Sequence, residues 1–478
     1  MVDILIEGGI VMTMNPDRKI FGDGAIAIEG DQIVAVGDTS EVKSKYPTAK
    51  RVINAESKLA MPGFVDCHSH PHHNIIKGMV PGNYGYGNPW IDRVGELYML
   101  GQYTEERTYL STLMCCLESI RAGTTTFIGT APAGVEEAQI RGTTESGIRT
   151  ILAVSGEDIF GPPGYVRPGA NVKKHGASAE ENIQRIEGYI QKYNNTVDGC
   201  LTVWPSLRQM QNSSDALCRL SKELADKYGV GVHAHANVMR PMVDKVVEGF
   251  GKTPIMRLYD NDALGPNVLL AHTAYMPGDD VAAIRETNTN LCHCIFTSMG
   301  LGYGAALFAN FPGWLRMGIN VALGTDGAVC CNHKDMIRVM NATFLVNKEG
   351  KYHNDLWPPE SVVEMATING AKALYMEKEI GSLEAGKKAD IILFDLTKPE
   401  WVPVHRYNLI ENLVLSATAE SIDTSIINGK VVMEGRQVKT IDEGDLAEKI
   451  QKEGELYLQG TKFLGAEKPY PENMPALW

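Results

Sequence analysis

Eight short apolar runs, separated by longer helix-like stretches, dominate the middle of the chain. They lie at 60–68, 124–130, 149–154, 199–205, 230–235, 267–272, 290–296 and 320–325. The stretches 105–122 and 214–228 have the composition and length of connecting helices. Regular alternation of strands and helices produces a parallel sheet, and eight such units close it into a barrel. We therefore predict an α/β protein whose main domain, residues 58–376, is a (β/α)8 TIM barrel.

Both ends of the chain show strand-like runs without helices between them, at 3–11, 25–29, 32–36, 380–396 and 425–438. The last two runs each have a strand–turn–strand pattern, and Asn428-Gly429 is a strong hairpin signal. We predict that residues 1–57 and 377–440 build one small β-sandwich from both chain ends. Residues 441–478 are expected to form a C-terminal helix and an extended tail.

Charge and composition limit the partners and the compartment. The net charge of −13 disfavours nucleic acid and anionic membranes, which bind basic surfaces. No run of eighteen apolar residues is present, so we expect no membrane span. Asp3 and Glu7 stand where a signal peptide needs basic residues, which predicts a cytoplasmic protein. The nine cysteines lack the spacing of structural zinc sites and are expected to be buried, reduced thiols.

Metal-binding side chains follow four of the eight expected strands. His68 and His70 end the first strand, where residues two apart point to the same face. His235 ends the fifth, His272 the sixth and Asp326 the eighth. All strands of such a barrel end on one rim, where active sites lie. The His-x-His pair alone could be two histidines of a polar loop, as we expect for 72 and 73, but the full set predicts a metal site.

These motifs resemble those of the amidohydrolase superfamily. The resemblance rests on PGFVDCHSH, HAH at 233–235, LAH at 270–272, GTDG at 324–327 and GSLEAGKKADIILFD, and it extends over nearly the whole chain. The sequence looks most similar to the branch of cytosine, guanine and adenosine-derivative deaminases and s-triazine hydrolases, near the phenylurea and thiocarbamate hydrolases. The resemblance implies a distorted barrel with a sandwich from both chain ends, and a small-molecule substrate. We also expect a homo-oligomer, a dimer or tetramer.

The resemblance further implies the roles of the rim residues. His68, His70 and His235 would be imidazole ligands and Asp326 the carboxylate ligand of one divalent ion, with zinc preferred over iron, cobalt or manganese. Dinuclear relatives bridge two ions with a lysine at the end of the third or fourth strand, and neither strand has one here. We therefore expect a mononuclear centre.

Proton transfer is assigned, on the same resemblance, to Asp326 and His272. Asp326 would accept a proton from the attacking water, and His272 would steady the developing charge or pass the proton on. His233 lies one pleat deeper than His235, which favours a core or supporting role. His293 matches a histidine of this branch that shapes the substrate pocket, although the proline that usually follows two residues later is Ile295 here.

Val238 is the main departure from the deaminase pattern. The branch normally carries a glutamate three residues after the fifth-strand ligand, where it protonates a ring nitrogen. Val238 cannot do so, and the neighbouring Asn237 can only form hydrogen bonds. We therefore rank hydrolysis of an amide, urea, carbamate or thiocarbamate above deamination or hydrolysis of an aminated purine, pyrimidine or s-triazine. A non-catalytic binding protein on the same scaffold is disfavoured because the ligand set is complete.

Aromatic residues in two loops predict a largely apolar substrate. Tyr84 and Trp90 lie in the glycine- and proline-rich loop 78–90, and two more aromatics lie in 160–165. With Asn237, Val238 and His293 these residues are our candidates for substrate binding. The alternative for both loops is ordinary surface turns with packed aromatic side chains.

Overall fold

Parallel strands form a closed ring in the computed structural model, which describes residues 1–78, 103–159, 177–350 and 357–459. The strands are β6 (Phe64–His70), β7 (Thr124–Ala131), β8 (Arg149–Gly156), β9 (Leu201–Leu207), β10 (Val232–Ala236), β11 (Val268–His272), β12 (Asn290–His293), β13 (Val321–Leu323) and β14 (Asp326–Gly327). They pair in the order β13-β12-β11-β10-β9-β8-β7-β6-β14. β13 and β14 are two pieces of one barrel position: β13 pairs with β12 and β14 with β6. The ring therefore closes, which confirms the predicted barrel.

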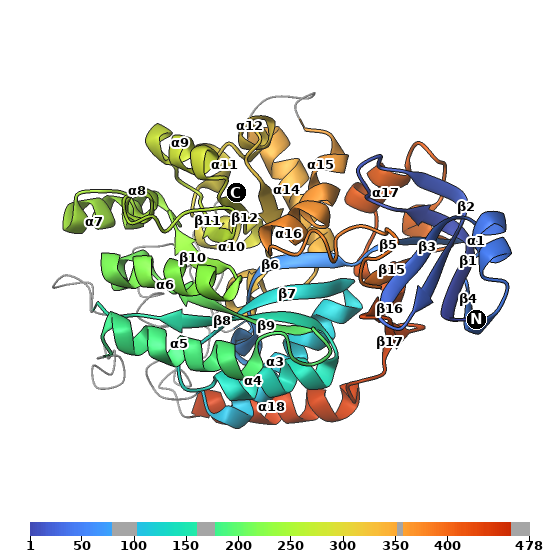
Figure 1. Ribbon diagram of the computed structural model, residues 1–478, viewed down its shortest axis with the longest axis horizontal. Coiled ribbons are helices and arrows are strands. Elements are labelled where there is room, and N and C mark those ends of the chain that lie inside the picture. The colour runs from blue at the N-terminus through green and yellow to red at the C-terminus, as the bar shows by residue number, and fades with distance from the viewer. Residues whose placement is uncertain (79–102, 160–176, 351–356, 460–478) are drawn as a thin grey trace, which may run out of the picture.

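Helical segments connect the barrel strands and lie outside the ring (Figure 1). They are η1 (Pro71–Ile76), α3 (Glu105–Arg121), α4 (Glu136–Ser146), α5 (Ala179–Tyr193), η2 (Met210–Asn212), α6 (Asp215–Tyr228), α7 (Arg240–Phe250), α8 (Pro254–Asp260), α9 (Gly278–Thr287), α10 (Ile295–Leu301), α11 (Ala305–Phe308), α12 (Phe311–Arg316), α13 (Ala328–Cys331), α14 (Met336–Gly350), α15 (Pro359–Met365) and α16 (Ile368–Ala373). The local sequence sets where some of these helices begin. Ser178 and Glu181 form a capping box at the start of α5, and Ser214 caps the start of α6.

The two chain ends build one second sheet, to one side of the barrel in Figure 1. Its strands are β1 (Val2–Met12), β2 (Ile20–Glu29), β3 (Gln32–Asp38), β4 (Ala49–Asn54), β5 (Lys58–Pro62), β15 (Ile391–Asp395), β16 (Ile422–Ile427), β17 (Lys430–Glu434) and β18 (Gln437–Val438). The antiparallel pair β5–β15 joins the N-terminal strands to the C-terminal ones. Asn428 and Gly429 have φ angles of 50° and 74° and form the expected hairpin turn.

Further helices flank this sheet and the barrel. They are α1 (Thr39–Lys45), η3 (Pro399–Trp401), α17 (Leu409–Leu415), η4 (Ala419–Ser421) and α18 (Glu443–Gln459). α18 packs along α3 beneath the barrel (Figure 1). Within the described part of the chain, no helix combines the length and the apolar character that crossing a membrane requires.

Two expected strands differ from the structure. The run 290–296 is extended only to His293, because its pairing with β13 ends there and α10 begins at Ile295. Residues 380–390 do not form the first strand of a hairpin. Gly381 and Gly386 turn the backbone with φ angles of 86° and 92°, and Gly386 N donates to Ile33 O at 2.8 Å, so this segment follows the edge of β3 as a loop.

A buried ion pair fastens the second sheet to the barrel. The Arg149 guanidinium at the start of β8 donates from Nε to Asp390 Oδ2 at 2.8 Å and from Nη2 to Asp390 Oδ1 at 3.1 Å. Nη2 also donates to Asn428 Oδ1 at 2.9 Å. The two charged side chains are only 1% and 3% exposed. Burial opposes the charge of Arg149, but Asp390 raises the pKa of the guanidinium above its ordinary value.

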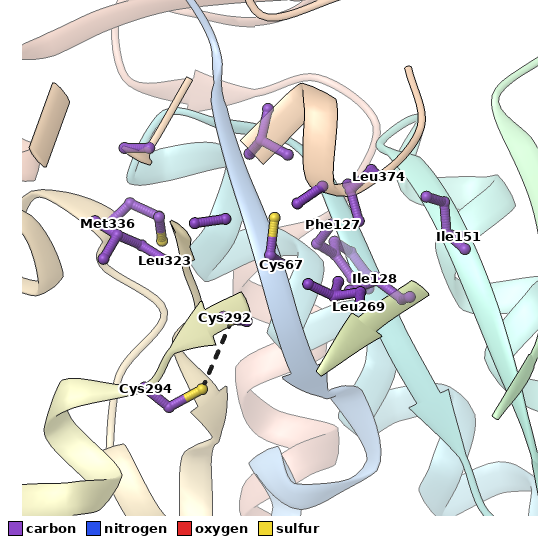
Figure 2. Packing of buried hydrophobic residues seen from close by; sticks show 14 of the residues in the cluster. Cys67, Phe127, Ile128, Ile151, Leu269, Cys292, Cys294, Leu323, Met336 and Leu374 are labelled. Carbon is purple, nitrogen blue, oxygen red and sulfur yellow. Dashed lines mark hydrogen bonds between the residues drawn. The ribbon is translucent and has the colours of Figure 1, made fainter. Parts of the chain in front are cut away.

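The barrel interior is packed with apolar side chains and thiols. Figure 2 shows Cys67 of β6, Phe127 of β7, Leu269 of β11 and Cys292 of β12, all members of the main buried apolar cluster around the barrel strands. All nine cysteines are free, and eight of them are buried. Cys292 Sγ lies 3.8 Å from Cys294 Sγ, too far for a disulfide bond. The expectation of buried free thiols is confirmed for eight cysteines, and Cys330 is half-buried.

Candidate metal centre

Three imidazoles and one carboxylate converge at the carboxyl end of the barrel strands. Asp326 Oδ1 lies 3.4 Å from His68 Nε2 and 3.3 Å from His70 Nε2. His235 Nε2 lies 3.3 Å from His70 Nε2. Among the described residues, His68 Nε2 is a buried nitrogen with no hydrogen-bond partner. Nitrogen lone pairs that face one another and a carboxylate form the donor set of a divalent cation such as zinc, so these side chains fit the predicted ion.

The charge states of these groups suit a cation. Burial lowers the pKa of His70 and of His235 well below the usual value, and neighbouring histidines lower both further. Both rings are therefore neutral at pH 7, the form that binds metals. Burial alone would raise the pKa of Asp326, but the His68 imidazole and the Thr297 hydroxyl hold it well below its usual range. Asp326 is thus an anion.

Hydrogen bonds behind the ligands orient two of the rings. His68 Nδ1 lies 3.0 Å from His233 Nε2, and His233 Nδ1 lies 3.1 Å from Ser206 Oγ. Thr130 Oγ1 lies within hydrogen-bond distance of His70 Nδ1. When Nε2 of His68 and of His70 faces the ion, each Nδ1 carries the proton and donates it to these partners. His233 therefore takes the supporting position that its place on the strand indicated.

Replacing His233 with leucine should weaken metal binding by about 10–100-fold, the usual effect of losing such a supporting partner. The His68 Nδ1–H group would then lose its buried acceptor. Competition with a chelating dye, on protein first stripped of metal, measures the change. Ser206→Ala is the matched control: it removes only the outer hydrogen bond and should have a smaller effect. Unchanged affinity in His233→Leu would contradict the orienting role.

Asp326 also faces the groups that can move protons. Thr297 Oγ1 donates to Asp326 Oδ2 at 2.7 Å, and His272 Nε2 lies 3.9 Å from the same oxygen. Both His272 and Asp326 have left-handed backbone angles, with φ of 76° and 65°. Non-glycine residues take this conformation mainly where the surrounding structure holds them for a function. Asp326 Oδ1 thus faces the candidate imidazole ligands, and Oδ2 faces His272, the candidate acid–base partner.

Of the remaining candidates, Asn237 bonds through its side-chain nitrogen to residues outside the candidate ligand set. Its Nδ2 donates to Asp280 Oδ2 at 2.6 Å and to Tyr275 O at 2.9 Å. Val238 is 6% exposed and lines a water-sized hollow beside His235. His293 is buried against Phe311, with ring centroids 4.0 Å apart, and burial lowers its pKa to about 3. Tyr84, Trp90 and the segment 160–165 lie outside the described residues, so their predicted roles stay predictions.

His72 and His73 are buried beside His70, contrary to our expectation of a polar loop. They lie on η1, which is fixed to α3 because Ser111 Oγ donates to Pro71 O at 2.8 Å and accepts from Ile75 N at 3.1 Å. The His73 ring stacks on that of His70 with centroids 4.8 Å apart. Burial lowers the pKa of His73 to about 3, so its ring is neutral.

Sequence reasoning missed the polar residues that support the ligands. Thr130, Ser206 and Thr297 are hydroxyl residues without a spacing that marks them. Lys334 is fully buried and donates to Ser69 Oγ at 3.0 Å and to Thr325 Oγ1 at 3.2 Å. Burial opposes its charge, yet nearby thiols and carboxylates raise its pKa above the ordinary value. The only available signal was its position eight residues after Asp326.

A histidine and carboxylate cluster at the carboxyl rim of a (β/α)8 barrel is characteristic of metal-dependent barrel hydrolases. The family model described as "Amidohydrolase family" matches residues 59–432, and the chain belongs to this family. A model of an imidazolonepropionase-like composite domain of bacteria also matches residues 24–49. The chain is accordingly an enzyme that hydrolyses carbon–nitrogen bonds other than peptide bonds.

Similar proteins align over almost the full chain. A 5-methylthioadenosine/S-adenosylhomocysteine deaminase of Pelotomaculum thermopropionicum is 31% identical over 460 residues, which are 95% of this chain and 98% of that protein. A 5'-deoxyadenosine deaminase of Methanosarcina mazei is 30% identical over 461 residues, 95% of this chain and 98% of that one.

Solved structures share the fold. An adenosine deaminase from Xanthomonas campestris with bound zinc has a TM-score of 0.86 at 22% identity, covering 96% of this chain and 99% of that one. Atrazine chlorohydrolase from Arthrobacter aurescens, complexed with zinc, has a TM-score of 0.83 at 21% identity, with 94% and 100% covered.

Proposed function

We propose that this amidohydrolase holds one zinc ion with His68, His70, His235 and Asp326 and hydrolyses a C–N bond at a carbon that is already a carbonyl or its equivalent. Amides, ureas, carbamates and thiocarbamates of small, largely apolar molecules are the substrate class. The observation that carries the proposal is Val238, a buried apolar side chain where a ring-protonating glutamate is expected. The homo-oligomeric state, the cytoplasmic location and the division of the chain into four ranges stay predictions. β5 pairs with β15 in the second sheet, although its residues fall in the range 58–376 that was predicted as the barrel.

Zinc is supported by the donor set and by the two similar structures that contain bound zinc. Three imidazole nitrogens and one carboxylate oxygen are common zinc ligands. When bound, the ion would polarise the substrate carbonyl and lower the pKa of a water molecule toward neutrality. The other steps belong to side chains of this chain.

Asp326 and His272 are the proposed acid–base pair. Asp326 is anionic, and its Oδ2 is held by the Thr297 hydroxyl, so it can take a proton from the attacking water. His272 Nε2, 3.9 Å from the same oxygen, can receive that proton and deliver it to the leaving nitrogen. Amides and ureas need no protonation of a ring nitrogen before attack. This pair therefore suffices for them.

A second candidate is deamination of a nucleoside-like substrate. The curated relatives, at 30–31% identity over nearly their full length, are described as deaminases of adenosine derivatives. Deamination would require another acid in place of residue 238. Asn237 is a poor substitute for the missing glutamate, because its amide is hydrogen-bonded to Asp280 and does not titrate.

A substrate panel with zinc-loaded enzyme separates the two candidates. We expect amine release from ureas, carbamates or amides and no ammonia from aminated purines, pyrimidines or methylthioadenosine. Val238→Glu should raise ammonia release from the heterocycles. Val238→Gln should not, because glutamine has nearly the shape of glutamate but no titrating group. Ammonia release by the unmodified enzyme from heterocycles alone would overturn the ranking.

A further inference from the structure

Lys334 is a fully buried cation directly behind the candidate ligands. It lies between α13 and α14 and is 1% exposed. Lysine is almost never buried to this degree unless its ammonium is paired and hydrogen-bonded, because an unpaired charge in the interior is strongly destabilising. The contacts of this side chain therefore indicate why it lies there.

The Lys334 ammonium contacts β6 and β14, two of the three strands that carry candidate ligands. Lys334 Nζ donates to Ser69 Oγ at 3.0 Å, and Ser69 stands between His68 and His70 on β6. Nζ also donates to the main-chain oxygen of Asp326, the first residue of β14. Ser69 and Asp326 are themselves paired in the ladder between β6 and β14. Lys334 thus links the carboxyl end of β6 to β14 through hydrogen bonds to both.

A buried carboxylate balances the charge through one threonine. Thr325 Oγ1 accepts from Lys334 Nζ at 3.2 Å and donates to Asp66 Oδ2 at 2.5 Å. Asp66 Oδ1 accepts from Thr325 N at 2.9 Å and from His68 N at 3.2 Å. Asp66 is 1% exposed. The chain from Asp66 through Thr325 to Lys334 therefore spans the base of the site.

The Asp326 backbone needs such support. Its φ of 65° is unfavourable for a residue with a side chain. The hydrogen bond from Lys334 to its main-chain oxygen, and that from Gly327 N to its Oδ1 at 2.6 Å, hold this conformation. Without the ammonium, the carbonyl of Asp326 would lose its buried donor, and the side chain would be free to leave the ligand geometry.

We propose that Lys334 is a positioning residue that holds Asp326 and the His68–His70 segment in the geometry that binds the metal ion. This inference rests on the proposed function, because it takes Asp326 as a ligand. A simpler role would be that of a charge partner for Asp66, needed for stability alone. The two roles predict different behaviour when both charges are removed together.

The experiment compares Lys334→Met, Asp66→Asn, the double variant Asp66→Asn/Lys334→Met and the exposed control Lys372→Met. Each is stripped of metal; thermal unfolding of the apo-protein and zinc affinity by dye competition are measured first, then kcat and KM with saturating zinc. For Lys334→Met we expect a lower apo Tm, a zinc affinity weakened by about 10–100-fold and a lower kcat with KM changed less than about twofold. The double variant should regain the apo Tm but neither the affinity nor kcat. Lys372→Met should match the unmodified protein.

Zinc affinity in the double variant decides between the roles. A value like that of the unmodified protein means that Lys334 only balances Asp66, and the inference fails. It also fails if Lys334→Met binds zinc and turns over normally. If Lys334→Met does not fold, the double variant still gives the answer, because it removes both charges of the Asp66–Lys334 pair. Failure of the unmodified protein to bind zinc would refute the proposed function itself, a separate and recognisable outcome.

Discussion

Asp326→Ala is expected to lose turnover by about 10⁴-fold or more, because we propose this one side chain both as metal ligand and as proton acceptor. Its Oδ1 lies among the imidazole nitrogens and its Oδ2 faces Thr297 and His272. His70→Ala should cause a similar loss of turnover. It removes only a proposed metal ligand, because the proposed acid–base pair, Asp326 and His272, stays in place.

Metal content and activity, measured together, separate these two effects. Elemental analysis after dialysis against zinc should give well under one ion per chain for His70→Ala. With excess zinc, His70→Ala should regain more activity than Asp326→Ala, which lacks the proton acceptor at any zinc concentration. Asp244→Ala, on the exposed side of α7, is the matched carboxylate control and should retain full activity. Normal turnover in Asp326→Ala would refute the site.

The largest expected effect on stability comes from Arg149→Met. Removing one partner of a buried ion pair leaves the other charge unpaired, which destabilises proteins by about 3–5 kcal/mol. Here Asp390 would remain buried between β8 and the β16–β17 hairpin, with its bond from Asn428 N as partial compensation. We expect unfolding at a lower denaturant concentration, followed by circular dichroism and by tryptophan fluorescence.

The double variant Arg149→Met/Asp390→Leu tests the cause. Because it removes both charges, it should recover most of the lost stability. The exposed ion pair between Lys430, on the same β16–β17 hairpin, and Asp198 is the control, and Lys430→Met should change stability by no more than about 1 kcal/mol. If Arg149→Met unfolds like the unmodified protein, the ion pair does not fasten the second sheet to the barrel.

The barrel and the positions of the rim residues were predictable because both depend on local periodicity. The carboxyl ends of the strands in a closed parallel barrel share one rim. Strand order alone therefore predicts that His68, His235, His272 and Asp326 lie close together. The hairpin at Asn428-Gly429 followed in the same way from local turn preference.

Features that depend on contacts between distant residues were not predictable. His72 and His73 are buried because η1 is fastened to α3 through Ser111, some forty residues away in sequence. The segment 380–390 is a loop because its hydrogen bonds go to the edge of β3. Lys334 acts on Ser69, 265 residues earlier, and no local pattern reveals such a partner.

The eighth barrel position is divided into β13 and β14, and the second piece both closes the barrel and carries the proposed catalytic carboxylate. On the edge of β6 that faces away from β7, the pairs are with Asp326 and Gly327, so the proposed catalytic carboxylate belongs to the two-residue strand that completes the ring. At Gly327 an added Cβ would lie 2.0 Å from His73 Nδ1, so a larger residue is excluded there. Substitutions at these two positions would therefore change the pairing that closes the barrel as well as the reactivity of the site. Engineering a new specificity should leave this strand intact and vary the opposite wall, around Val238.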